Sequence, residues 1–572
     1  FETASLHECI FLRYYTFPSF YVACAGMDNF KIVVFIMAIL ISLMAIANNR
    51  KLPYPILLVF AGLIIGFIPH LPELALDPDV VFVIMLPPLL YDAASKTSWH
   101  EFKTSIRPIS ALAVTLVFFT TVAVAVTAHY MIPGFSWPLA FVLGAVVSPP
   151  DAVAASGIIK GLGLNKKVIT ILEGESLVND ASALIAYRYA VMAVTTGTFV
   201  FWKAGIQFLL VAGVGVAIGI LIGYLFVWAH KRIENNPLVE TSLTLLAPFV
   251  SYLAAEHFHM SGVLAVVSTG LLMSWRSPEI FSYQARMRTR VVWDTVIFLL
   301  HGFIFILIGL QLPGIIKDLG RYPLATILGY GLTISLVTIL VRIIWVFAGT
   351  YWQNFFKKKK KEADASPDNA ESESTWKNVL VVAWTGTRGV ISLAAALALP
   401  LVLQDGSAFP KRSSIIFLAF VVIFVTLVVQ GLSLPLLIRW LKIKPQDNTD
   451  EEEKELQLYL ASSTLHFIEK EFPVPDDHRL QEQFIKQYEQ QIRKLTKEIQ
   501  LHKRARYFNT EVKPAMPDNL LNVKLEISKF QRELLVKLHK DGEFSDSAIR
   551  QIEREMDIDE LKLNRQLPKE PS

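Results

Sequence analysis

Cysteine is almost absent from this sequence: only Cys9 and Cys24 occur among 572 residues. Both precede Met27, so neither a disulfide framework nor cysteine-based metal or thiol chemistry can operate in the rest of the chain. Charged residues are also scarce, at 18%. The net charge of +4 provides no basic face for nucleic acid, because Lys and Arg lie in short segments between apolar runs.

Hydrophobic residues make up 53% of the chain, and the mean hydropathy is +0.44. A single soluble core cannot bury that much apolar surface, so the lipid bilayer is the expected solvent. The apolar runs are about 17 to 28 residues long, which is the length a helix needs to cross a membrane. We therefore predict an all-α polytopic membrane protein with about 13 transmembrane helices.

Most Lys and Arg residues of the loops lie in one alternating set, from Arg50 and Lys51 to the run at 357–361. Positive loops stay in the cytoplasm, so the amino end is predicted outside the cell membrane and the carboxyl end inside. This multi-pass arrangement is expected in the plasma membrane.

Three regions follow from the change in composition along the chain. Residues 1–26 precede Met27, which begins an apolar run, and form an N-terminal extension whose status the sequence leaves open. Residues 27–441 are predicted to be the transmembrane domain. Residues 442–572 are polar and periodic and are predicted to be a cytosolic helical tail, either a stabilising or dimer-contacting appendage or a regulatory element.

Ionisable side chains inside the apolar runs are the main functional signal, because a charge within the membrane is costly and needs a partner. The candidates lie in the third, fifth, sixth and twelfth runs: Asp92, Asp151, Glu175, Asp180 and Arg388. Other charged residues, such as Arg188, Glu240, Glu256 and Arg342, are isolated or nearer the ends of their runs.

The fifth run, 138–160, contains Pro149 and Pro150 directly before Asp151. Two prolines remove main-chain donors and do not allow a continuous helix there. Carbonyl groups freed inside a membrane must be buried in protein or face a water-filled cavity, and with a carboxylate they form a site suited to a small cation. A structural kink would account for the prolines but not for Asp151, so we predict a broken helix that binds an ion.

The twelfth run, 376–402, is interrupted in a similar way by Gly386 and Gly389 on either side of Arg388. Paired broken helices in corresponding positions of inverted repeats are typical of the midplane site of a transporter. Arg388 is always protonated and needs a buried anion. We predict Glu175 as its partner, which leaves Asp151 and Asp180 to exchange ions, while Asp180 is the alternative partner.

The sixth run contains GESLVND, in which Ser176 and Asp180, and likewise Glu175 and Asn179, are four positions apart. A helix places each such pair on adjoining parts of one face. Ser and Asn alone could serve to hold helices together. The two carboxylates instead indicate an ion site.

Six motifs, taken in order along the chain, resemble those of the monovalent cation/proton antiporters. They are LPPLLYDAA, GAVVSPPDAVAAS, LEGESLVNDASALI, FHMSGVLAVVSTG, FIFILIGL and WTGTRGVISLAAALALP. The resemblance covers roughly residues 28 to 441 and is closest to the bacterial-type sodium/proton exchanger branch with an Asn-Asp core motif, here Asn179 and Asp180. It implies an antiporter of Na⁺, or of K⁺ or Li⁺, without a cofactor. Homodimerisation and electroneutral one-for-one exchange are implied as well.

The resemblance also assigns roles to individual residues. Asp180 and Asp151 would supply carboxylate oxygens to the cation, Ser176 a hydroxyl, and Pro150 a main-chain carbonyl. Asn179 and Asp92 would hold a water or order the site, and Glu175 and Arg388 resemble a buried ion pair. The family often has Thr before the crossover Asp and Pro after it, whereas this chain has Pro150 and Ala152.

Three alternatives differ in ion or in class. The same fold could exchange potassium or lithium for protons. A sodium-coupled symporter of an organic anion would need a positive, roomy pocket, whereas the predicted core is acidic with one Arg. An intramembrane hydrolase would draw on His257, His259, His301 and Ser261, but HExxH and GxSxG are missing from the spans.

Overall fold

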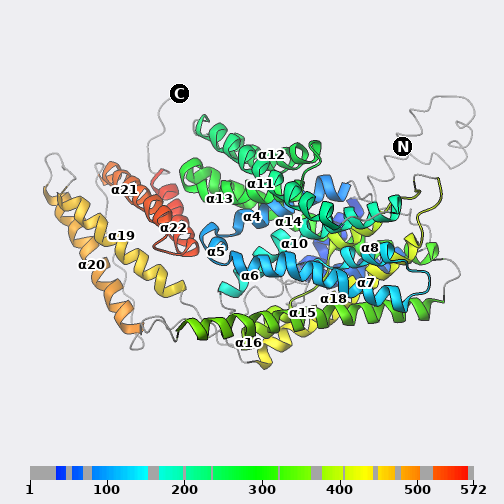
Figure 1. The fold of residues 1–572 in the computed structure, drawn as a ribbon. Coiled ribbons are helices and arrows are strands. Elements are labelled where there is room, and N and C mark those ends of the chain that lie inside the picture. Colours follow the sequence, from blue (N-terminus) through cyan, green and yellow to red (C-terminus); the bar gives the residue numbers. More distant parts are fainter. Residues whose placement is uncertain are drawn as a thin grey trace, which may run out of the picture. The chain divides into compact units, whose positions relative to one another are not determined.

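The structure is a computed structural model, and it describes residues 34–46, 54–68, 80–151, 166–197, 201–233, 236–319, 323–361, 376–403, 406–441, 449–470, 478–502 and 520–564. Within these ranges the regular secondary structure is helical (Figure 1), apart from an isolated antiparallel bridge between Val402 and Ala408. The predicted extension at residues 1–26 lies outside the described residues.

The helices before the tail include two π-helical segments, η1 and η2. In chain order they are α3 (Tyr54–Gly66), η1 (Val80–Met85), α4 (Leu86–Lys96), α5 (Trp99–Thr104), α6 (Ile106–Ser110), η2 (Ala111–Leu116), α7 (Val117–Met131), α8 (Trp137–Val147), α10 (Lys166–Thr196), α11 (Phe201–Lys231), α12 (Pro237–His257), α13 (Gly262–Ile280), α14 (Tyr283–Asp318), α15 (Leu324–Lys361), α16 (Trp376–Trp384), α17 (Val390–Leu397) and α18 (Arg412–Trp440). A further apolar helix spans Val34–Ile46.

Six helices in the described part of the chain are long and apolar enough to cross a membrane. They span Ile106–Met131, Gly205–Lys231, Pro237–His257, Tyr283–Lys317, Leu324–Thr350 and Arg412–Trp440. Shorter apolar helices occur at Val34–Ile46, Tyr54–Gly66 and Trp137–Val147. α10 is also long, at 31 residues, but its polar side chains lower its hydropathy. The polytopic character predicted from the sequence agrees with these helices.

The helices stop where the sequence predicts interruptions. α8 ends at Val147, before Pro149, and residues 148–151 are not helical. Residues 152–165, the rest of the fifth run, lie outside the described part. α16 ends at Trp384 and α17 begins at Val390, so Arg388 lies in a non-helical connection.

The chain divides into two compact units, of which the first comprises Phe1–Leu76 and Val296–Gly320. In this unit α3 and the later part of α14 touch through glycine. A Cβ atom at Gly62 would overlap the carbonyl of Ile306, and one at Gly309 would overlap the carbonyl of Val59. Only glycine allows the two backbones to come this close.

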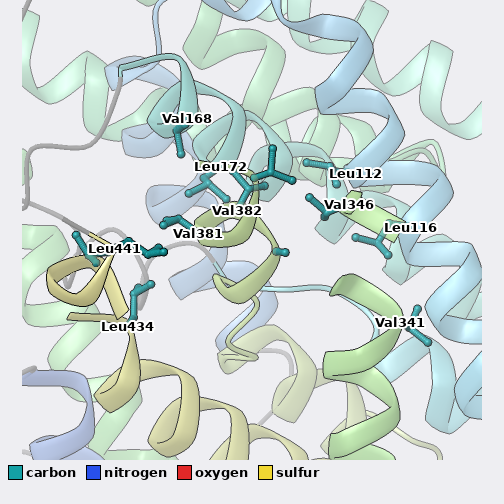
Figure 2. Close-up of a cluster of buried hydrophobic side chains, with 13 residues drawn as sticks. Leu112, Leu116, Val168, Leu172, Val341, Val346, Val381, Val382, Leu434 and Leu441 are labelled. Atoms are coloured by element: carbon teal, nitrogen blue, oxygen red, sulfur yellow. The ribbon is translucent and has the colours of Figure 1, made fainter. Parts of the chain in front are cut away.

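The second unit comprises Asp77–Thr295 and Arg321–Ser572. Its buried apolar cluster joins the first half of α10 to η2, α15, α16 and α18 (Figure 2). The cluster contains Leu112, Leu116, Val168, Leu172, Val341, Val346, Val379, Val381, Val382, Ala383, Leu434, Ile438 and Leu441. Because interiors are close-packed, this cluster fixes α10 against the interrupted helix α16.

The predicted tail is helical where it is described. Its helices are α19 (Thr449–Lys470), α20 (His478–His502), α21 (Leu520–Asp541) and α22 (Asp546–Asn564). One apolar cluster joins α19, α21 and α22 through residues such as Leu456, Leu538 and Ile552. A second cluster joins α19, α20 and α21 through Ile468, Phe484 and Ile527.

Candidate functional site

The non-helical segment after α8 and the connection between α16 and α17 cross each other. The main-chain N–H of Asp151 donates to the carbonyl of Thr387 at 2.6 Å. The Thr387 hydroxyl donates to the carbonyl of Asp151 at 3.0 Å. Each non-helical segment therefore forms hydrogen bonds with main-chain groups of the other segment, as non-helical backbone within a membrane protein requires.

Gly389 allows the close approach of the two segments at this crossing. A Cβ atom at this position would overlap the carboxylate of Asp151. The glycine predicted from sequence as a helix interruption therefore has a second role, because its missing side chain makes room for the carboxylate that faces the crossing.

If the crossing binds the cation predicted from the sequence, Gly389→Ala should lower cation/proton exchange about 10-fold or more, because misplacing a ligand by about 1 Å can cost up to about 100-fold. Cation-dependent proton flux in membrane vesicles would measure the loss. Gly329→Ala is the matched control, since a Cβ there meets nothing within 4 Å. Wild-type flux in Gly389→Ala would show that the close approach is dispensable.

Asn179 on α10 ties this helix to the crossing. Its Nδ2 donates to the carbonyl of Pro150 at 2.8 Å, and the residue is completely buried. A carbonyl can only accept, so this bond fixes the orientation of the amide. The amide oxygen Oδ1 is buried and has no hydrogen-bond partner among the described residues. An oxygen in this position can accept from a water or a protonated carboxyl group, or bind a cation.

Asp180 follows Asn179 and is 5% exposed. It is an electrostatic neighbour of Asp151, which itself is partly exposed. Ser176 lies one helical turn before Asp180 on α10 and is partly buried. The structure thus places the carboxylate of Asp180, on a continuous helix, close to the carboxylate of Asp151 at the crossing. Carboxylate oxygens are hard ligands suited to a small cation.

Arg388 is buried and binds main-chain carbonyls at the carboxyl end of α8. Its Nε donates to Val147 at 3.0 Å and its Nη2 to Ser148 at 3.4 Å. Its Nη1 donates to the carbonyl of Gly386, in its own connection. The carboxyl end of a helix is the negative end of its dipole, so a guanidinium is favourable there.

The predicted ion pair between Glu175 and Arg388 is wrong in its partner. Glu175 instead forms a two-pronged pair with Arg342 on α15, with Nη1–Oε1 at 2.5 Å and Nη2–Oε2 at 2.8 Å. Arg342 also donates to the carbonyl of Val382 on α16. The main-chain carbonyls described above accept the hydrogen bonds of Arg388. The guanidinium of Arg342 instead binds the Glu175 carboxylate in a bidentate arrangement.

Asp92 is buried on α4 and pairs with Lys96 through Oδ2 at 2.9 Å. Lys96 also contacts Asp294 at 3.0 Å. The sequence places Asp92 in a run with Pro87 and Pro88, but it does not reveal this charged partner one helical turn further on.

Helices that are interrupted and cross beside buried carboxylates are typical of secondary ion transporters. The sequence matches the family described as sodium/hydrogen exchanger, transmembrane, over residues 34–440. The chain belongs to this family, so it is a multi-pass membrane protein of the cation/proton exchangers, which are transporters rather than enzymes. The family resemblance of the sequence motifs is thereby confirmed.

Individual relatives agree with this assignment. An uncharacterized Na⁺/H⁺ exchanger from Mycobacterium bovis is 31% identical over 538 residues, covering 93% of this chain and 96% of that protein. A sodium, potassium, lithium and rubidium/H⁺ antiporter from Bacillus pumilus is 32% identical and is covered to 60% of its length by 70% of this chain. The sodium proton antiporter MjNhaP1 from Methanocaldococcus jannaschii has a similar fold, with a TM-score of 0.57 and 19% identity over 73% of this chain and 99% of that chain.

Proposed function

We propose that this protein exchanges sodium for protons across the membrane, with Asp180 as the carboxylate that binds one ion or the other. The observation that supports this proposal is the position of Asp180: it is buried on α10, beside Asp151 and next to the residue that ties α10 to the crossing. Such a carboxylate is either protonated or bound to a cation, because an unpaired buried charge is costly.

The cation ligands in this proposal are carboxylate oxygens of Asp180 and Asp151, the hydroxyl of Ser176 and the main-chain carbonyl of Pro150. The Pro150 carbonyl already accepts a hydrogen bond from Asn179. A carbonyl oxygen has a second lone pair, so it can bind the cation at the same time. Asn179 then orders the site, and Asp92 is proposed to order it from α4.

The transport cycle is an exchange of ions at one site. A cation entering from one side displaces the proton of Asp180, and a proton from the other side displaces the cation. Alternating access requires α10 and the helices packed with it to move against a scaffold. We propose that the Glu175–Arg342 pair keeps α10 and α15 together during this movement.

Potassium is the second candidate ion, with lithium close to it in chemistry. The relative from Bacillus pumilus is named for sodium, potassium, lithium and rubidium. Side-chain type does not fix the size of an oxygen-lined site, and all these ions prefer oxygen ligands. Proton flux in proteoliposomes, measured with NaCl, KCl and LiCl in turn, tests the function and identifies the ion. Equal flux with choline chloride would reject cation exchange.

We expect exchange to be electroneutral, with one proton for each monovalent cation. Asn179 stands beside Asp180 where a second carboxylate would add a titratable group. With equal pH on both sides, an imposed membrane potential should then leave the rate of cation uptake unchanged. Vesicles containing Asp180→Asn protein would correct for leakage driven by the potential. A rate that follows the potential would require unequal numbers of charges.

The remaining features of the proposal concern the arrangement in the cell. We propose about 13 spans with inverted repeats, in a plasma membrane, with the amino end outside and the tail in the cytoplasm. We also propose a homodimer.

A further inference from the structure

The tail helix α22 contacts the end of α4 and the turn that leads to α5, residues 95–98, which we call the α4–α5 corner. Asp546 accepts a hydrogen bond from the Ser98 hydroxyl at 2.5 Å. Arg550 donates to the carbonyl of Lys96 at 2.8 Å and to that of Thr97 at 3.4 Å. Arg550 therefore supplies donors to carbonyls at the carboxyl end of α4, and Asp546 binds Ser98, which directly precedes α5.

Ser98 is the N-cap of α5, because its hydroxyl oxygen accepts from the N–H of Glu101 at 3.1 Å. The same hydroxyl thus donates to the tail and accepts from the first turn of α5. Asp546 and Ser98 are 5% and 9% exposed, so this contact is sheltered from water. Burial alone would raise the pKa of Asp546, but the neighbouring His539 and the Ser98 hydroxyl hold it below its ordinary value.

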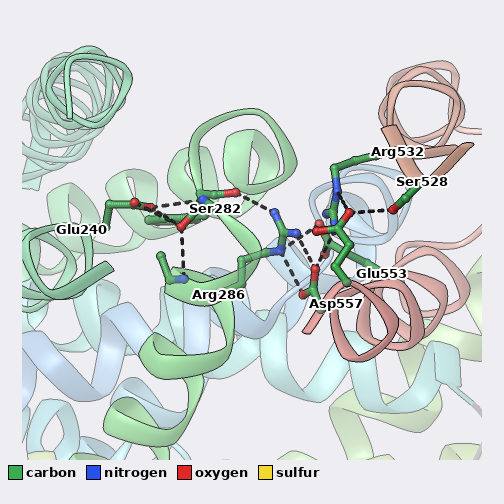
Figure 3. Close-up of polar contacts among 10 residues, drawn as sticks. Glu240, Ser282, Arg286, Ser528, Arg532, Glu553 and Asp557 are labelled. Carbon is green, nitrogen blue, oxygen red and sulfur yellow. Dashed lines mark hydrogen bonds and ion pairs between the residues drawn. The ribbon is translucent and has the colours of Figure 1, made fainter. Parts of the chain in front are cut away.

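A second group of tail contacts anchors α22 on α14, close to where α14 begins. Arg286 donates from Nη2 to Asp557 at 2.6 Å and approaches Glu553 at 3.3 Å (Figure 3). Arg532 on α21 also pairs with Asp557, at 2.9 Å. The Arg286, Asp557 and Glu553 side chains are at most 10% exposed, so the charges are largely desolvated. The tail is therefore held at two separate places.

The α4–α5 corner lies between two sets of helices in the second unit. α4, α11, α12 and α13 form one connected set, and α7, α8, α10, α15, α16, α17 and α18 form another; α10 also contacts α4, α11 and α13 directly. α5 follows α4 in sequence and leads through α6 and η2 to α7. α5 contacts both α10 and α13, so a displacement of α5 would change one of the links between the two sets.

α5 also packs directly against α10, the helix of Asp180. Thr170 donates to the Glu101 carboxylate at 2.8 Å. At Gly174 an added Cβ would lie 2.5 Å from Ile109 and 3.3 Å from Phe102. Gly174 directly precedes Glu175, so α5 and α6 fit closely against the turn of α10 that precedes the proposed ion site.

From these contacts, we infer that Asp546 is a positioning residue for cation binding, which acts through Ser98, α5 and the Glu101–Thr170 bond on α10. This inference rests on the proposed exchange at Asp180. Tail docking thereby gives the cytosolic region a defined effect on the membrane site. Loss of the Asp546–Ser98 bond shifts α5 and weakens the fit of the α10 ligands to the cation.

The test uses the full-length protein in proteoliposomes and measures proton flux against NaCl concentration. Asp546→Ala and Ser98→Ala should each raise the apparent KM for Na⁺ by about 2- to 30-fold, with maximal flux changed less than about twofold. The double variant should be no worse than the more severe single one, because both remove the same bond. Asp546→Glu, which keeps the carboxylate, should recover part of the affinity.

Matched variants separate positioning from a general effect on the tail. Asp541→Ala removes an exposed acidic residue at the end of α21, and Arg554→Gln removes an exposed Arg one turn beyond Arg550. Both should keep the wild-type KM, whereas Arg550→Gln should raise it. An unchanged KM in Asp546→Ala and Ser98→Ala, or fully additive effects in the double variant, would overturn the inference. If Asp180→Asn still exchanges ions, the proposed role of Asp180 fails instead.

Discussion

Vesicles containing Asp180→Asn protein should show no more cation-dependent proton flux than vesicles without the protein. Asn keeps the size and most of the shape of the side chain but cannot lose a proton or neutralise a bound cation. Asp180 is buried on α10, and its charged neighbour Asp151 belongs to the segment that follows α8. The substitution therefore removes the exchanged charge while leaving the helix packing in place.

Two measurements make this expectation specific. Protein in the membrane fraction should be equal for the variant and the wild type, and its elution in detergent should be unchanged. Asp541→Asn makes the same chemical substitution at an exposed residue of the tail and should exchange normally. Wild-type flux in Asp180→Asn would remove Asp180 from the proposed site and leave Asp151 as the remaining acidic candidate at the crossing.

The interruptions of the helices could be predicted from the sequence because proline and glycine act locally. Pro149 and Pro150 end a helix whatever surrounds them, and α8 stops before them. Gly386 and Gly389 lie in the connection between α16 and α17. Polar side chains in an apolar run can also be identified from the sequence, because burying one in a membrane is costly unless it has a partner. Asn179 and Asp180 are such residues, and both are buried on α10.

The partners of these residues could not be predicted in the same way. Two buried arginines lie near Glu175, and only the three-dimensional arrangement shows that Arg342 takes the carboxylate while Arg388 takes main-chain carbonyls. A signal for Arg342 was present, because it stands alone in the long apolar run of α15. In the sequence, however, Gly386 and Gly389 on either side of Arg388 mark it as the residue at a helix interruption, whereas Arg342 is isolated.

Contacts between distant parts of the chain could not be predicted from the sequence for a related reason. The tail is amphipathic, which predicts helices that pack on something, but not on what. Nothing in the sequence distinguishes Ser98 and Asp546 from other polar residues. Their role becomes visible only in the fold, where the Ser98 hydroxyl donates to the Asp546 carboxylate at 2.5 Å. The sequence alone therefore left the tail as either an appendage or a regulatory element.

The buried pair of Glu175 and Arg342 gives the largest expected effect on stability. Arg342→Gln and Glu175→Gln should each lower the free energy of unfolding by about 3 to 5 kcal/mol, because each leaves one charge buried without its partner. Both residues are 1% exposed, so water cannot replace the lost contact without rearrangement. Thermal unfolding in detergent, followed by loss of the monodisperse peak, would detect this as a lower midpoint. The exchange of charges, Glu175→Arg with Arg342→Glu, should recover part of the loss.

A double-mutant cycle decides which arginine is the partner. The two fork-like hydrogen bonds at 2.5 and 2.8 Å predict strong coupling between Glu175 and Arg342. Arg388 is held by the carbonyls of Val147 and Ser148, so its cycle with Glu175 should give a smaller coupling energy. Stronger coupling to Arg388 would reverse the assignment and return Arg388 as the counter-ion. Since Arg342 also donates to the Val382 carbonyl, its loss should loosen α16 as well as α10, which is why its removal should cost more than that of Glu175.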